Sequence, residues 1–171
     1  MQDEKTENTD TKEIVKSSKN ELAENSAEID ELYKKMDDNS TYLIFSVGKK
    51  LYAIKTLFIQ EIMHSAKIYP LPFVPEYIEG IVNCRGLPFT VVNTLKMAEE
   101  VDEEISGGTV LVFKREDDNF GIHISNIEMF FEPEEQDIKA EGIRYKMNLI
   151  PFFDVDSIEE RLLEDLQEKE E

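Results

Sequence analysis

Residues 78–95 read IEGIVNCRGLPFTVVNTL and contain two apolar runs, residues 81–82 and 89–92, separated by a short polar turn. Runs rich in Val, Ile and Phe on either side of a glycine-bearing turn are typical of two strands that meet at a hairpin-like bend. The bend carries Arg85 where the chain leaves the core, and a planar guanidinium there can pair with carboxylates or backbone carbonyls of a protein partner. The alternative is that Arg85 is an ordinary solvated turn residue.

The composition indicates one globular domain, or two small halves packed together. The chain has 171 residues, of which 40% are hydrophobic, and this is enough to form a core. Its longest apolar runs are far shorter than the roughly 18 residues that a membrane helix needs. The first residues lack the basic start and apolar stretch of a secretion signal. The single cysteine excludes an internal disulfide and fits a reducing compartment, so we expect a cytoplasmic protein.

The charge argues against nucleic acid and anionic membranes as partners. The formal net charge is −19 at pH 7, whereas binding to phosphate backbones or anionic lipids requires clustered Lys and Arg. Residues 1–40 and 156–171 are heavily acidic, and the middle of the chain mixes both signs. Acidic flanks most often keep a protein soluble, so they identify no partner.

The chain divides into an acidic arm at residues 1–40, a folded body at residues 41–158, and an acidic C-terminal helix or tail at residues 159–171. The first twenty residues have almost no apolar content, which predicts disorder. An amphipathic helix is predicted over residues 20–36, because apolar residues recur there at helical spacing. These residues are Leu22, Ile29, Leu32, Tyr33 and Met36. A further helix is predicted from Ser157, which has capping-box spacing to Glu160.

The body reads as many short strands separated by turns. Residues 41–47 and 51–54 predict one hairpin, and residues 109–113 and 120–125 predict a second one with a similar pattern. Short strands at this spacing, with helices only at the ends, predict an all-β barrel or sandwich. The two similar hairpins suggest two related halves.

The sequence offers no constellation of catalytic, cofactor-binding or metal-binding residues. The two histidines, His64 and His123, lie at no ligand spacing to each other or to the single cysteine. No glycine-rich phosphate-binding loop occurs. Cys84 could have its thiolate stabilised by Arg85 and act as a reactive thiol, but an isolated cysteine between apolar strands is more often a small buried residue. We therefore expect no enzyme, no cofactor and no metal.

Three parts of the chain together resemble the signature of the CheW family, the coupling proteins of bacterial chemotaxis. The family's Gly, two apolar residues, Asn, an apolar residue, Arg and Gly are matched by residues 80–86. Its apolar residue followed by Gln-Glu-Ile is matched by residues 59–62, and its Pro before the turn by Pro75. The resemblance covers residues 41 to about 158. It implies a mainly β fold of two five-stranded SH3-like barrels packed side by side.

The resemblance also implies a function. Members of the family are adaptors, whose groove between the barrels receives the cytoplasmic tip of a chemoreceptor and whose strands meet the regulatory domain of the histidine kinase CheA. Carried over to this chain, the partner-binding positions are Ile59, Glu61, Gly80, Asn83, Arg85 and Gly86. Each also has a structural reading: Ile59 as core, Gly80 as a backbone requirement, and Glu61 with Arg85 as a surface ion pair.

Two further functions stay open at this level. One is a specialised scaffold of the same fold that binds the kinase, or other CheW-like proteins, without a receptor. The other is a thiol or redox sensor that uses Cys84. The chain also departs from the family, with Thr90 and Asn93 where Pro and Asp are common and with a short connection from Ile127 to Gly142. These departures concern the partner surface of the second barrel most.

Overall fold

The computed structural model describes residues 40–100, 104–105, 107–116 and 118–167. The predicted disordered segment and amphipathic helix before residue 40, and the last residues of the acidic tail, lie outside this part. The described residues form ten strands: β1 (Tyr42–Val47), β2 (Lys50–Lys55), β3 (Ile59–Met63), β4 (Ile78–Cys84), β5 (Leu87–Val92), β6 (Thr109–Phe113), β7 (Phe120–Ile124), β8 (Asn126–Phe131), β9 (Gly142–Tyr145) and β10 (Asn148–Pro151). The helical elements are η1 (Thr56–Phe58), α2 (Thr94–Met97), η2 (Glu135–Asp137) and α3 (Val155–Gln167).

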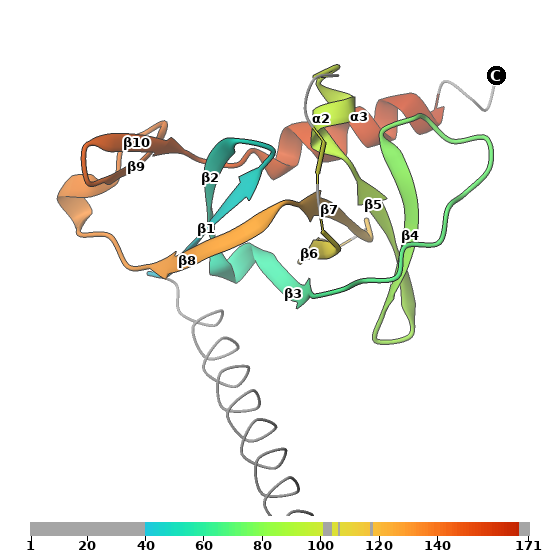
Figure 1. The fold of residues 1–171 in the computed structure, drawn as a ribbon, viewed down its shortest axis with the longest axis horizontal. Coiled ribbons are helices and arrows are strands. Elements are labelled where there is room, and N and C mark those ends of the chain that lie inside the picture. The colour runs from blue at the N-terminus through green and yellow to red at the C-terminus, as the bar shows by residue number, and fades with distance from the viewer. Residues whose placement is uncertain (1–39, 101–103, 106, 117, 168–171) are drawn as a thin grey trace, which may run out of the picture. The chain divides into compact units, whose positions relative to one another are not determined.

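The strands form two β subdomains (Figure 1). One is a five-stranded sheet in the order β3-β6-β7-β5-β4, antiparallel except for the parallel pair β5–β7. The other joins the three-stranded sheet β2-β1-β8 to the hairpin β9–β10, through a bridge between Ala53 and Phe152. The predicted mainly β fold with two SH3-like subdomains is confirmed. Neither subdomain is a closed barrel. The second consists of a three-stranded sheet and a separate two-stranded hairpin.

The two subdomains are not the two halves of the sequence. The first hairpin, β1–β2, pairs with β8, which comes late in the chain, whereas the second hairpin, β6–β7, joins strands β3 to β5. The chain crosses back at Ser125, whose N–H donates to the Ser46 carbonyl at 2.8 Å and whose Oγ accepts from Gly48 N–H at 2.9 Å. Backbone groups in a core must be paired. The strands therefore take the neighbours that complete each sheet, whatever their order in the sequence.

The core explains why β1 carries apolar residues on both of its faces. All six β1 residues are buried, because Tyr42 and Ile44 pack with Ile143 and Ile150 of the β9–β10 hairpin on one face, while Phe45 on the other face meets the ring of Phe153. The two subdomains are linked by aromatic rings that meet at Phe153. Its ring centroid lies 5.3 Å from that of Phe45, in β1, and 6.3 Å from that of Phe113, in β6. Such contacts stabilise the joint beyond the apolar area that they bury.

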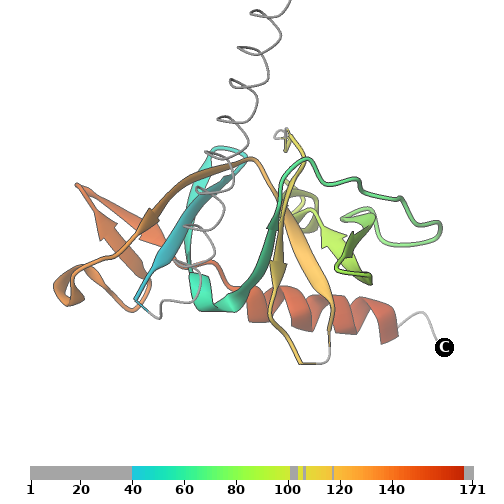
Figure 2. The ribbon, with the colours of Figure 1, turned by 90° about the horizontal axis from the view of Figure 1, so that it is seen from below.

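The C-terminal helix begins two residues before the predicted start. Asp154 caps it by accepting from Ser157 N–H at 3.1 Å and from the Ser157 hydroxyl at 2.6 Å, so the predicted role of Ser157 as the cap is wrong. Tyr77, which precedes β4, donates to Asp165 near the far end of α3 at 2.5 Å. Both views show α3 running along the five-stranded sheet (Figure 2). Among the described residues, no helix is long and apolar enough to cross a membrane.

Candidate functional site

The turn between β4 and β5 is a two-residue loop made of Arg85 and Gly86. The strands pair up to Cys84 and Leu87, and both loop residues have positive φ, +53° for Arg85 and +88° for Gly86. This is the pattern of a type I′ turn, whose twist matches that of antiparallel strands. The Asn83 side chain accepts from Gly86 N–H at 2.8 Å and holds the loop. The left-handed backbone conformation costs a non-glycine residue such as Arg85 roughly 1 kcal/mol, so an arginine at this turn position is less favourable for the backbone than a glycine.

Arg85 makes an ion pair across the edges of the five-stranded sheet. Its Nε donates to Glu61 Oε2 at 2.7 Å, and Glu61 lies on β3. β3 and β4 are the two outer strands in the hydrogen-bonding order, so the pair can form only because the sheet curls until its edges approach. The Arg85 side chain is 64% exposed, and the Glu61 side chain is 21% exposed. The ion pair therefore marks where this SH3-like sheet nearly closes, on the surface of the molecule.

Cys84 lies beneath this pair and is a packing residue. It is 2% exposed, in a cluster with Val82, Phe89 and Val91, and its Sγ is 3.5 Å from Glu61 Oε2. Burial raises the pKa of the thiol, the Glu61 carboxylate raises it further, and the opposing effect of Arg85 is smaller. A buried neutral thiol is a poor nucleophile. This geometry disfavours the thiol-sensor alternative.

Gly80 is required by the backbone around it. Its φ is +143°, and a Cβ added there would lie 2.1 Å from the Tyr69 carbonyl oxygen. The close approach arises because Tyr69 and Ile81 exchange two backbone hydrogen bonds of 2.8 Å, which attach the segment before β4 to this outer strand. Gly80 thus admits the strand-like segment that covers the sheet edge.

The six predicted site residues separate into two groups. Glu61, Asn83, Arg85 and Gly86 meet at the β4–β5 turn, whereas Gly80 and Ile59 lie inside the fold. Ile59 is fully buried, so its side chain packs in the core and can influence a partner only by positioning the residues that follow it on β3. Partner binding by any of the six stays a prediction.

Exposed apolar side chains on the same hairpin and on the segment attached to it complete this surface. Leu87, directly after the turn, is 54% exposed, and Tyr69, bonded to β4, is 49% exposed with Lys67 Nζ 5.0 Å from its ring centroid. No local pattern signals that this segment lies on β4, because the contact joins residues twelve positions apart. Alternation along β5 places Leu87 on the same face as the buried Phe89 and Val91, so the sequence pattern would predict it to be buried, and only the structure shows its exposure beside the turn.

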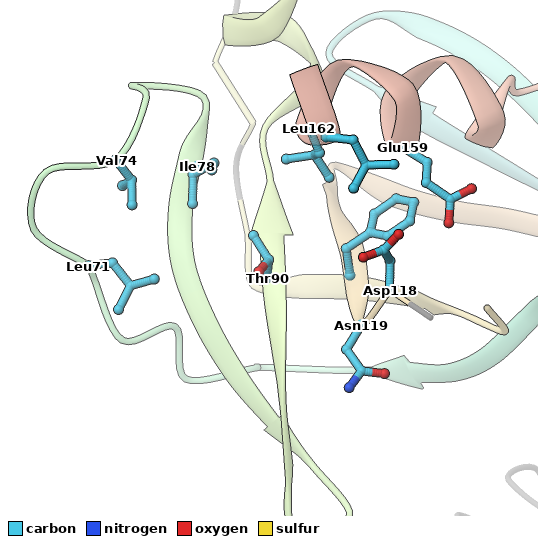
Figure 3. Close-up of a pocket in the computed structure, with 10 residues that line it drawn as sticks. Leu71, Val74, Ile78, Thr90, Asp118, Asn119, Glu159 and Leu162 are labelled. Carbon is cyan, nitrogen blue, oxygen red and sulfur yellow. The ribbon is translucent and has the colours of Figure 1, made fainter. Parts of the chain in front are cut away.

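A separate apolar groove lies beside α3 (Figure 3). It has a volume of about 130 Å³, and Ile78 and Leu162 face it from β4 and from α3. Asp118 and Glu159 are the charged residues in its lining. In a chain with a net charge of −19, carboxylates are expected near any surface hollow, so they identify no partner.

Comparison with known proteins finds similarity to CheW proteins. The family model of the CheW-like domain matches residues 41–154. The chemotaxis protein CheW of Treponema pallidum (strain Nichols) is 28% identical over 110 residues, which cover 61% of this chain. The chain spans 64% of the length of that relative. In the crystal structure of the scaffolding protein TtCheW from Thermoanaerobacter tengcongensis, the fold is similar with a TM-score of 0.60, over 69% of this chain and 90% of that one, at 17% identity.

Proposed function

Because the chain belongs to the CheW-like domain family, we propose that it is a non-enzymatic adaptor that couples chemoreceptors to the histidine kinase CheA. In this proposal it works in the cytoplasm at receptor arrays. It binds the receptor tip and the regulatory domain of the kinase through different surfaces, so that a change in one contact alters the free energy of the other. Other CheW-like proteins are further candidate partners.

The observation that carries the proposal is the exposed Glu61–Arg85 pair at the β4–β5 turn. Its 2.7 Å bond orients a guanidinium that is 64% exposed. Exposed ion pairs contribute only about 0–1 kcal/mol to stability. A partner carboxylate or carbonyl can therefore replace Glu61 at little cost to the fold, while Leu87 and Tyr69 supply apolar area beside it.

A binding experiment with a matched control tests this function. The full chain is titrated by calorimetry against a receptor cytoplasmic tip and against the regulatory domain of CheA, and we expect binding to both. Arg85→Glu should abolish receptor binding and leave kinase binding intact. The control is Arg144→Glu, which makes the same charge change at an exposed position of β9, outside the five-stranded sheet, and should leave both affinities unchanged.

The outcomes separate the alternatives. Binding to the kinase without the receptor would support the specialised scaffold in place of the coupling adaptor. Absence of binding to both partners would end the proposal. An equal loss with Arg144→Glu would show that the effect of Arg85→Glu is one of net charge, and the turn would no longer be the candidate site.

A further inference from the structure

A second cluster of polar side chains lies at the other end of β4, away from the turn. Glu79 Oε2 is 2.7 Å from His123 Nδ1, and Glu79 Oε1 accepts from Asn93 Nδ2 at 2.7 Å. The second ring nitrogen, His123 Nε2, is 2.9 Å from the Gly107 carbonyl oxygen. Asn93 also caps α2, since its Oδ1 accepts from Lys96 N–H at 3.1 Å. The cluster therefore connects β4, β7 and the start of α2.

These contacts determine the protonation of the histidine. When Glu79 is ionised, both ring nitrogens face acceptors, a carboxylate oxygen and a backbone carbonyl oxygen, and a neutral imidazole can donate from only one of them. His123 is therefore an imidazolium when all the contacts are made. The side chains of His123 and Glu79 are 9% and 18% exposed, so little water can reach them to replace a hydrogen bond that is lost.

The charges around the cluster favour the same state. The positive charge of Lys96, on α2, lowers the pKa of Glu79, as His123 also does. β5 and β6, the strands bonded to β7, carry no charged residue. The hydrogen bond to Glu79 raises the pKa of His123 above its usual 6.5 although burial opposes it. Burial alone would raise the pKa of Glu79, but the hydrogen bonds from His123 and Asn93 lower it below 4.5.

We propose that Glu79, Asn93 and His123 form a pH-sensitive latch, which ties β7 to β4 and α2 while His123 is protonated and loosens when the ring loses its proton. Loss of the proton leaves either Glu79 Oε2 or the Gly107 carbonyl oxygen without its donor. The latch is a conformational device within the five-stranded subdomain and does not depend on the adaptor function.

The sign of the pH effect follows from the two pKa shifts. The stabilisation from His123 is fully present below pH 6.5 and is lost as the pH rises through the higher pKa of the folded state. The stabilisation from Glu79 is present above pH 4.5 and is lost as the pH falls through its lowered pKa. The latch is therefore strongest between these limits. Each unit by which the pKa of folded His123 exceeds 6.5 multiplies the folding equilibrium constant by about ten.

Nitrogen NMR of the imidazole rings tests the protonation directly in the full chain. We expect His123 to be more than half protonated at pH 6.5, with both ring nitrogens carrying a proton, and to lose the charge only as the pH rises further. The His64→Gln variant assigns the signals, since His64 is the only other histidine and is exposed. A His123 ring that titrates at or below pH 6.5 would overturn the latch.

Urea unfolding at a series of pH values tests its effect on stability. The urea midpoint of the wild type should fall as the pH rises above 6.5, and His123→Gln should remove this fall. Glu79→Gln should lower the pH at which His123 titrates. The control His64→Gln should keep the wild-type profile. Parallel profiles for the wild type and His123→Gln would contradict the proposal, and the NMR measurement decides it even if a variant does not fold.

Discussion

Two carboxylate–cation pairs, one near each end of β4, have the same length and different surroundings. Glu61–Arg85 and Glu79–His123 are both 2.7 Å apart. The Arg85 side chain is 64% exposed, whereas the His123 side chain is 9% exposed. In water the attraction between opposite charges is screened and the pair contributes little. In the interior, removing one partner leaves an uncompensated buried charge.

The two pairs differ in the exposure of the cation, and not in the distance or in the exposure of the carboxylates, which is 21% for Glu61 and 18% for Glu79. The exposed pair can exchange one of its members for a partner protein without much loss of stability, which suits a binding surface. The buried pair cannot, and it connects strands. β4 therefore carries a candidate recognition group at its turn and a structural cluster toward its beginning.

The largest expected effect concerns Gly80, which lies between the two pairs on β4. Gly80→Ala places a Cβ 2.1 Å from the Tyr69 carbonyl, and we expect the free energy of unfolding to fall by at least about 3 kcal/mol, as for other severe backbone clashes. Gly86→Ala is the control, because a Cβ there meets nothing within 4 Å and only its φ of +88° opposes the change. That variant should lose about 1 kcal/mol. If urea unfolding showed equal losses of free energy for the two variants, the backbone of β4 would be able to shift at Gly80 and relieve the clash.

The next effect compares the two carboxylates themselves. Glu79→Ala should lower the free energy of unfolding by about 1–3 kcal/mol, since it leaves the His123 and Asn93 side chains without the carboxylate that accepts from them. Glu61→Ala should lower it by less than about 1 kcal/mol. Both are measured by urea unfolding at neutral pH. If the two losses were the same, the distinction between the exposed pair and the buried pair would fail.

The smallest effect is expected at Arg85 and its neighbouring thiol. Arg85→Ala should change the free energy of unfolding by less than about 1 kcal/mol.

Alkylation of Cys84 should be slow in the native protein and in Arg85→Ala, and fast only after unfolding, because burial is the largest cause of the raised pKa of the thiol. Rapid alkylation of the native chain would revive the thiol-sensor alternative. Slower alkylation in Arg85→Ala alone would show that Arg85 activates the thiol.

Part of this site could be predicted from the sequence because its determinants are local. The alternation and the glycine of residues 78–95 predict two strands and a bend, and the Asn83–Gly86 bond that shapes the turn spans three residues. Arg85 follows from its place on the bend, whereas the position of Glu61 came from resemblance to a family. Ile59 came from the same resemblance, and only the structure shows that its side chain is buried.

The remaining features join residues that are distant in sequence. Glu61 meets Arg85 because a five-stranded sheet curls until its outer strands approach, and Glu79 meets His123 across an interleaved strand order. Predicting either contact requires the strand order, which the pairing of backbone groups over the whole chain decides. His123 could be predicted only to be a polar residue on an alternating strand.

The amino-acid sequence by itself determined the mainly β class, the β4–β5 bend and the exposed arginine on it, because strand periodicity and turn chemistry act over a few residues. The tertiary structure alone decided which strands share a sheet, which carboxylate each cation meets, and how deeply each pair is buried. Those outcomes depend on long-range hydrogen bonding and on the exclusion of water from the core, and neither is encoded in any short stretch.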